Sequence, residues 1–446
     1  MPAGRPPVRV VVLNFNGGEH TLRSLRHLRA LDWPSDELQL ICVDNASSDG
    51  SVAAIEAELP EVEIRQVGRN DGFPANNLAL GDLDDVRYVA LVNNDAFVEP
   101  DFLGPLVAAL DDDPGLGAVC PKLVLAPRFG EVVVDSPPFD PGPGDGRALG
   151  VVLRGCEVDG VDVWRDTHTG RGGYGREADR SGTFEWLAPH GVVRVPVGDG
   201  AAAGATLLLT APDPVTISVD GGAGAVEVRV GPEPTPVTVE LTGERFDVVN
   251  NVGSELLTDG SGRDRGWLQR DDGQLDEPTE VFAWCGGAVL LRPEYLADAG
   301  LFDERFFLYY EDTDLAWRGR ARGWRYRTVP RSVVRHLHAA SSGEGSEVFA
   351  YHVERNRLLM LAKNASARMA LAQVVRYILV TLSYGRRDVV RPLLGRRRPR
   401  LTVVRRRVVS FVGFQRLLGP MLSDRRRLRR RQQVADEALS TWWVEA

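Results

Sequence analysis

The first hundred residues alternate short apolar runs with helical segments. The apolar runs cover residues 8–15, 38–44, 62–67 and 86–92. Between the first two runs, residues 19–31 place Leu22, Leu25 and Leu28 on one face of a helix. Apolar strands separated by helices of this length indicate right-handed βαβ units and a mostly parallel sheet. The sequence therefore predicts an α/β fold, whose ligands bind at the carboxyl ends of the strands.

Polar side chains stand where these predicted strands end. They are Asn14 and Asn16 after the first run, Asp44 and Asn45 after the second, and Asn93-Asn94-Asp95 after the fourth. Asp95 is a natural ligand for a hard cation, although capping of a turn is the commoner role of such a residue. A dinucleotide-binding dehydrogenase is disfavoured because no GxGxxG follows the first strand.

The pattern changes after about residue 127. Segments that alternate with a period of two, at 215–219, 226–230 and 237–241, are bounded by Gly, Pro or Asp, and this pattern predicts strands joined by tight turns. We expect four regions: the first part of the α/β domain at 1–130, an inserted β-sandwich at 131–250, the second part of the α/β domain at 251–350, and a helical, arginine-rich region at 351–446.

The C-terminal region is strongly basic. Residues 386–431 hold 17 arginines and two acidic residues, whereas the whole chain has a formal net charge of -9. The apolar patches 369–384 and 411–422 fit core or oligomer contacts, or a peripheral contact with an anionic membrane. Nucleic acid is an unsuitable partner because aromatic residues are sparse and the body is acidic.

The sequence also bears on where the chain is located. No apolar run reaches about 18 residues, the start does not resemble a secretory signal, and four scattered cysteines indicate a reducing compartment. We therefore expect a cytoplasmic location, with the inner face of the membrane as an alternative.

Three acidic residues, Glu311, Asp312 and Asp314, follow the aromatic run 306–310 at the start of a predicted helix. Carboxylates at a helix N-terminus are favoured by the helix dipole, so capping is the simplest explanation. A carboxylate beside an apolar wall can also keep a raised pKa and act as a base. His336 and His338 lead into Ser341-Ser342-Gly343, which indicates a loop of a functional site.

Several motifs occur in a fixed order. They are VVVLNFNGG, ICVDNASSDGS, GRNDGFPANNLAL, LVNND, CGGAVLLR and GLFDERFFLYYEDTDLAWR, followed by the loop at His336. In this order they resemble bacterial glycosyltransferases of family 2, which implies the GT-A fold. The nearest subgroup is the rhamnosyltransferase-like and galactofuranosyltransferase-like enzymes of cell-wall polysaccharide biosynthesis. The resemblance covers about 1–130 and 250–365. It implies that 1–130 is the nucleotide-sugar-binding half of the main domain and 251–350 the acceptor and catalytic half. For the insert, acceptor binding, self-association and plain support are equal alternatives.

The resemblance implies a role for each matching residue. The residues implied in binding the nucleotide-sugar are Asn14, Asn16, Asp44, Asn45, Arg69, Asp71, Asn76, Asn77, Asn94 and Asp95. Asp312 matches the general base, and Asp95 and His336 match the ligands of a divalent cation, Mn²⁺ or Mg²⁺. Asn93 stands where the family's metal motif has its first acidic residue. The residues implied near the acceptor are Trp284, Gly286, Gly287, Glu311 and Trp317, of which the two tryptophans fit core packing equally well.

The implied reaction is an inverting transfer of a sugar to a hydroxyl of a cell-surface glycan or polyprenyl-linked acceptor. The subgroup implies dTDP-rhamnose as the first donor to consider, ahead of UDP-galactofuranose and other UDP-hexoses. A non-catalytic carbohydrate-binding protein is the alternative of another class. The sequence leaves the acceptor, the linkage and the oligomeric state open.

Overall fold

Strand β1 (Val8–Asn14) is buried along nearly its whole length because it contributes to two cores. Val8, Val10 and Val12 pack in one cluster with leucines of helix α1 (Gly18–Arg29). Val11 points to the opposite face and joins a second cluster. A strand covered on both faces is typical of a parallel sheet inside an α/β fold.

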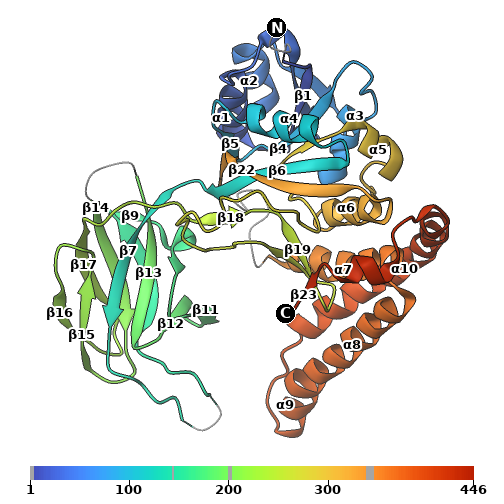
Figure 1. The fold of residues 1–446 in the computed structure, drawn as a ribbon. Helices are drawn as coiled ribbons and strands as arrows, with labels where there is room; N and C mark the ends of the chain where they lie inside the picture. Colours follow the sequence, from blue (N-terminus) through green and yellow to red (C-terminus); the bar gives the residue numbers. More distant parts are fainter. Residues whose placement is uncertain (1–4, 143–144, 199–202, 338–345, 446) are drawn as a thin grey trace. The chain divides into compact units, whose positions relative to one another are not determined.

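The computed structural model describes residues 5–142, 145–198, 203–337 and 346–445, drawn in Figure 1. It divides into two units. The first contains residues 1–124, 250–267 and 273–446, and the second contains residues 125–249 and 268–272. The predicted four-part division by function stays a prediction.

The first unit is built on a mixed sheet with the strand order β3-β2-β1-β4-β21-β6-β22-β5. The four strands at one end are parallel, β21 pairs antiparallel with β4 and β6, and β22 pairs antiparallel with β5. The further elements of this part are β2 (Leu38–Asp44), α2 (Ser51–Glu58), β3 (Glu63–Gln66), α3 (Asn77–Leu80), β4 (Tyr88–Asn93), β5 (Ala96–Val98), α4 (Leu103–Asp112), β6 (Leu116–Leu125), β21 (Ala288–Leu291), α5 (Pro293–Ala299), α6 (Glu311–Ala321) and β22 (Arg325–His336). The predicted α/β class with a mostly parallel N-terminal sheet is confirmed.

The second unit is an antiparallel β-sandwich around one apolar core. Its sheets have the orders β10-β13-β7-β15-β16 and β11-β12-β8-β14-β17. The strands are β7 (Arg128–Asp135), β8 (Val152–Val158), β9 (Val161–Asp162), β10 (His168–Thr169), β11 (Gly173–Asp179), β12 (Gly182–Leu187), β13 (His190–Val197), β14 (Ala203–Thr210), β15 (Val215–Asp220), β16 (Val226–Val230) and β17 (Thr235–Leu241). The period-two segments of the sequence are β15, β16 and β17. Buried residues alternate as predicted in β15 and β17, whereas in β16 Val226 is exposed and only Val230 is buried.

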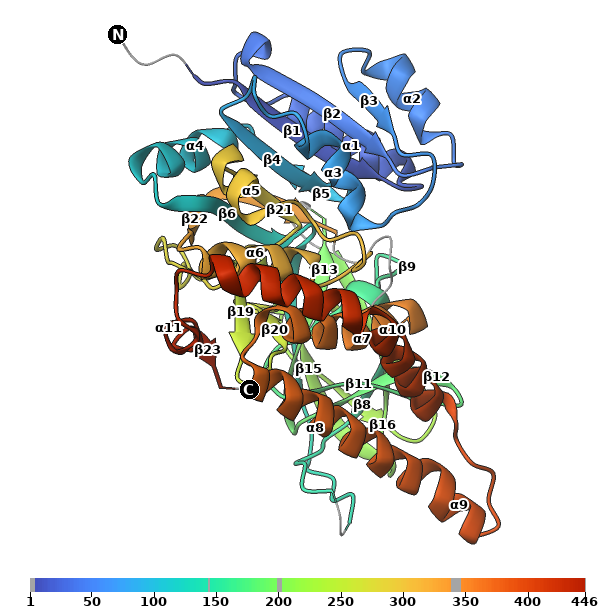
Figure 2. The same cartoon turned by 90° about the vertical axis from the view of Figure 1, so that its right-hand side faces the viewer.

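The chain then returns to the first unit through a small sheet and a series of helices, and its last strand joins that sheet. The small sheet has the order β20-β19-β23. These elements are β19 (Ser254–Leu257), β20 (Gly262–Asp264), α7 (Glu347–Asn364), α8 (Ala367–Gly385), α9 (Arg391–Leu394), α10 (Thr402–Arg431), α11 (Asp436–Ser440) and β23 (Trp443–Val444), with a single π-helical turn, Arg386–Val390, between α8 and α9. Figure 2 shows α8 and α9 extending away from the sheet of this unit.

Helix α2 begins after Gly50, which makes no side-chain cap. Asp49 instead binds Ser51 and the backbone of Gly18. All four cysteines are free. Within the described residues, no helix holds an apolar stretch long enough to traverse a bilayer.

Candidate active site

The ends of β1, β2 and β4 are tied together by a buried polar network. The Asn14 amide nitrogen donates to Asp44 Oδ1 at 3.1 Å and to Ser51 Oγ at 2.8 Å, and its carbonyl oxygen accepts from Thr21 Oγ1 at 2.8 Å. The Asn94 amide nitrogen donates to the same Thr21 oxygen at 3.2 Å. Since Asn14 is fully buried, it orients the strand ends from within the protein.

The network fits only because Gly17 has no side chain. A Cβ atom on Gly17 would lie 2.1 Å from Thr21 Oγ1 and 2.2 Å from the Asn94 amide nitrogen. Any larger residue would therefore push apart the turn after β1 and the end of β4. The glycine was visible in the sequence, but this contact depends on the register of three strands.

Asn45 holds a second loop beside these strand ends. Its side-chain oxygen accepts from the backbone of Asp71 at 2.8 Å, and its nitrogen donates to Asn70 Oδ1 at 2.9 Å. Asp71 pairs with Arg69 at 2.6 Å, and the Arg69 side chain is 78% exposed. Asn16 is also exposed, with a φ of 50°, and its side-chain oxygen accepts from Ser48 N at 2.7 Å. Of the residues predicted to hold the nucleotide, Asn16 and Arg69 are therefore the accessible ones.

Asn76 and Asn77 face the protein. Asn76 is buried and donates to the carbonyl of Phe73 at 2.9 Å. The Asn77 side chain donates to the carbonyl of Phe302 at 2.9 Å and accepts from its amide at 3.0 Å. These bonds attach α3 to the segment before α6 and support a positioning role.

Asp95 and His336 lie side by side just beyond the C-terminal end of β4. Antiparallel pairing sets His336, the last residue of β22, opposite Ala96 of β5. His336 Nε2 lies 3.1 Å from Asp95 Oδ1, and Nδ1 lies 2.8 Å from Asn250 Oδ1. All three side chains are buried. If Nδ1–H donates to Asn250, Nε2 carries the lone pair that can bind a cation. In many metal sites a ligating histidine donates its other ring N–H to a partner in this way.

This pair fits a six-coordinate cation. Two neighbouring ligands around Mg²⁺ at about 2.1 Å lie about 3.0 Å apart, close to the separation of Asp95 Oδ1 and His336 Nε2. One carboxylate and one imidazole leave positions for phosphate oxygens and water. The described residues contain no group of three His, Cys, Asp or Glu side chains that could hold a metal. His338 and Ser341-Ser342-Gly343 lie outside the described residues.

Gly286 and Gly287 lie between Asp312 and the pair formed by Asp95 and His336. The backbone amide of Gly286 donates to Asp312 Oδ2 at 3.1 Å, and Asn93 N donates to the carbonyl of Gly287 at 3.0 Å. A Cβ on Gly287 would lie 3.6 Å from His336 Cε1, and one on Gly286 would lie 3.4 Å from Asp312 Oδ2. The two glycines therefore bring together groups from β4, β22 and α6.

Asp312 is half-buried in the first turn of α6. Its Oδ1 accepts from Thr313 N at 2.5 Å and from Thr313 Oγ1 at 3.1 Å. Burial raises the pKa of Asp312 above its ordinary value, although these hydrogen bonds oppose the shift, and Asp264 adds to it. A carboxylate with this elevated affinity for a proton is suited to base catalysis.

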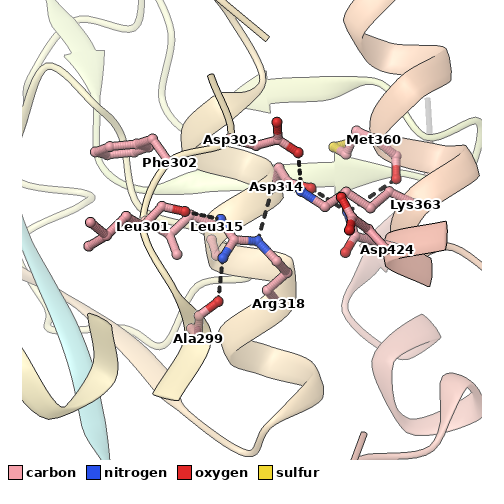
Figure 3. A network of polar contacts seen from close by, with 12 residues as sticks. Ala299, Leu301, Phe302, Asp303, Asp314, Leu315, Arg318, Met360, Lys363 and Asp424 are labelled. Carbon is pink, nitrogen blue, oxygen red and sulfur yellow. Dashed lines mark hydrogen bonds and ion pairs between the residues drawn. The ribbon is translucent and has the colours of Figure 1, made fainter. Parts of the chain in front are cut away.

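The other two acids of the cluster have different environments. Asp314 is fully buried and binds Arg318 at 3.0 Å, Lys363 at 2.8 Å and Asn364 at 2.7 Å. Figure 3 shows this network, in which Arg318 also donates to carbonyl groups of residues 299 and 301 and Lys363 to Asp303. Asp314 therefore joins α6 to α7 and takes no part in the candidate site.

Glu311 is 5% exposed, and its Oε2 has no hydrogen-bond partner. Burial, followed by the neighbouring charge of Asp312, raises the pKa of Glu311 well above its usual range. Burial thus acts in the same direction on the pKa of both carboxyls, and more strongly on that of Glu311.

The aromatic segment before α6 has an unusual backbone. Phe307, Tyr309 and Tyr310 have φ values of 66°, 67° and 70°, a region that costs roughly 1 kcal/mol or more for such residues. Asn356 of α7 stabilises this shape by donating to the carbonyl groups of residues 306, 308 and 309, each at 2.8 Å. The clamp by Asn356, like the contact of Asn250 with His336, has no local sequence signal because its partners are distant in the chain.

Trp284 and Trp317 lie in the core. Trp284 is fully buried and donates to Tyr295 OH at 3.4 Å, while Trp317 is 2% exposed and packs edge-on against Phe282. Neither indole presents a face on which a sugar could stack. Core packing, the alternative that the sequence left open, accounts for both residues.

Comparisons with known proteins agree with this arrangement. Residues 9–125 match the family model described as Glycosyl transferase family 2. N-acetylglucosaminyl-diphospho-decaprenol L-rhamnosyltransferases of two Mycobacterium tuberculosis strains, H37Rv and CDC 1551, are 40% identical over 80 residues, which are 17% of this chain and 26% of each relative. The match thus spans about a quarter of the length of these curated relatives. Residues 9–125 are therefore similar to glycosyltransferase family 2 domains.

Among solved structures, a mannosyltransferase of Pyrobaculum calidifontis in complex with GDP-Man and Mn²⁺ aligns with 93% of this chain and 88% of its own, at 14% identity and a TM-score of 0.42. GalNAc-T7 with UDP, GalNAc and Mn²⁺ aligns with 85% of this chain and 51% of its own, at 13% identity and a TM-score of 0.44. Residues 1–349 of S. aureus TarS align with 98% of this chain and 91% of theirs, at 13% identity and a TM-score of 0.39. The family match and the mixed sheet support the GT-A fold class that the motifs predicted.

Proposed function

We propose that the chain is an inverting glycosyltransferase that moves a sugar from a nucleotide-sugar to a hydroxyl group, with Asp312 as the base. The observation that carries the proposal is the placement of the half-buried Asp312 carboxylate beside Gly286, with His336 and Asp95 beside Gly287. The family match over residues 9–125 supports the reaction class.

The chemistry is a single displacement. Asp312 takes the proton of the acceptor hydroxyl while the oxygen forms a bond to the anomeric carbon. The bond from that carbon to the donor phosphate breaks on the opposite face, and its electron pair leaves with the nucleoside diphosphate. Configuration at the anomeric carbon therefore inverts, and the proton remains on Asp312 until solvent removes it.

A divalent cation, Mn²⁺ or Mg²⁺, held by Asp95 and His336 would offset the charge that develops on the diphosphate. Asn250 orients His336 by accepting from Nδ1. The polar ends of β1 and β2 and the accessible Asn16 and Arg69 would contact the nucleotide.

The finer assignments extend this proposal. A rhamnosyl donor is the first candidate because the curated relatives are rhamnosyltransferases. A glycan or lipid-linked acceptor is proposed on the same grounds. The four free cysteines support a reducing, cytoplasmic location.

The test is a screen of nucleotide-sugars for release of nucleoside diphosphate, with Mn²⁺, with Mg²⁺ and with a chelator. We expect release above background with one donor class, dTDP-rhamnose first, and loss of that release with the chelator. Binding of donors or glycans without release under any condition would instead support the non-catalytic carbohydrate-binding protein.

A further inference from the structure

Helix α8 presents an apolar stripe to solvent. Leu371, Val375, Ile378, Leu379 and Leu382 recur at helical spacing, and their side chains are all exposed. The opposite face holds Met369, Gln373 and Tyr377, which are buried in the first unit. One face of α8 therefore packs against the protein, and the other leaves large apolar side chains uncovered.

Further exposed apolar side chains follow α8 in the chain. Exposed side chains include Val390, Leu393 and Leu394 of the π-helical turn and α9, Leu401 before α10, and Val408, Val409 and Val412 of α10. We call these residues together with the α8 stripe the apolar surface. Scattered exposed apolar residues need no explanation, but a run of this length marks an interaction site.

Arginines border this surface. The exposed arginines of residues 386–400 are Arg386, Arg387, Arg391, Arg396, Arg397, Arg398 and Arg400, and the same stretch holds one acid, Asp388, paired with Arg387. Long cationic side chains beside an apolar face are the composition of helices that lie in a membrane interface. No helix of the described residues could cross the bilayer, so a membrane contact through this surface would be peripheral.

We propose that the apolar surface docks on an anionic lipid bilayer, with α8 lying in the plane of the headgroups and the arginines of 386–400 contacting lipid phosphates. Charge complementarity selects this occupant, because a second copy would bring the same arginines into mutual repulsion. The inference goes beyond the reaction, and a peripheral contact of this kind would bring the chain to a membrane that carries an acceptor.

The test is flotation of the full chain with vesicles, measured without donor. We expect the protein to float with vesicles of about 30% phosphatidylglycerol in phosphatidylcholine, and to bind pure phosphatidylcholine at least tenfold more weakly. Because exposed charges are screened by salt, binding to the anionic vesicles should fall at 0.5 M NaCl.

Two variants separate the apolar and charged contributions. Leu379→Glu with Leu382→Glu should weaken vesicle binding about tenfold or more because burial of two leucines is lost. Arg397→Gln with Arg398→Gln and Arg400→Gln should weaken it about 10- to 100-fold on anionic vesicles. The matched control is Val161→Glu, an equally exposed apolar residue of the β-sandwich, which should leave flotation unchanged.

Equal binding to neutral and anionic vesicles, or no flotation, would overturn the proposal. A dimer in sedimentation that Leu379→Glu converts to a monomer would also overturn it, because a second copy would then cover the surface. A chain that floats but releases no nucleoside diphosphate would contradict only the proposed function.

Discussion

Asp312 and Asp314, in the first turn of α6, have different environments. Asp314 faces α7, where it is fully buried and neutralised by Arg318 and Lys363. Asp312 faces Gly286 and accepts from neutral donors, the Gly286 amide and the amide and hydroxyl of Thr313. The comparison shows that two acids two residues apart can serve stability and chemistry separately, because each helix face meets a different environment.

The largest effect is expected from Asp312→Asn, which removes the proton acceptor but keeps the shape of the side chain. Turnover should fall about 10²- to 10⁴-fold, with the midpoint of thermal unfolding nearly unchanged. Steady-state release of nucleoside diphosphate measures this loss. Asp36→Asn, a change at an exposed acid, is the control and should retain full turnover.

Asp314→Asn should act mainly on stability. Removal of one partner from a buried ion pair typically costs 3–5 kcal/mol, and we expect about 3 kcal/mol because Lys363 keeps Asp303. Denaturant unfolding measures this loss, and turnover per folded molecule should stay close to that of the native chain. A variant as stable as the native chain would remove Asp314 from its structural role.

Asn250→Ala should weaken the cation site. Without the Asn250 carboxamide, His336 loses the partner that fixes its ring, and the loss of such a partner commonly costs 10- to 100-fold in metal affinity. The Mn²⁺ concentration that gives half-maximal turnover should rise by that factor, while excess Mn²⁺ restores the rate. An unchanged Mn²⁺ requirement would contradict the orienting role.

The pH dependence of activity and stability should differ. The pKa of Asp312 is raised, so the base becomes protonated, and activity falls, at a pH above the ordinary aspartate value of about 3.9. For Asp303, burial acts to raise the pKa, but Arg305 and Lys363 outweigh burial and lower it. Its stabilising contribution is therefore complete above pH about 3.9 and lost only as the pH falls further. On acidification, kcat/KM should decline before the free energy of unfolding does, and the reverse order would contradict the assignment.

The sequence predicted the elements that depend on local pattern. Strands such as β2 and helix α6 were recognised because apolar spacing and flanking residues are local properties. The meeting of Asp95 with His336 was inferred from resemblance, and in the structure it follows from pairing of β5 with β22.

The residue roles that the sequence did not indicate depend on contacts between residues far apart in the chain. Sequence spacing could not separate Asp312 from Asp314, because Lys363 and Asn364, which neutralise and bind Asp314, lie on α7 about 50 residues away. The sequence did not indicate the roles of Asn356 and Asn250 for the same reason, and it left an acceptor contact and core packing as equal alternatives for Trp284, which is buried in the core.

The most direct test of the account measures donor binding and turnover on the same samples of the native chain and Asp312→Asn. Calorimetric titration gives the dissociation constant of the donor in the presence of Mn²⁺, and release of nucleoside diphosphate at saturating donor gives the rate. The account predicts a dissociation constant within about threefold of the native value and a rate at least about 10²-fold lower. Near-native turnover in Asp312→Asn would contradict it.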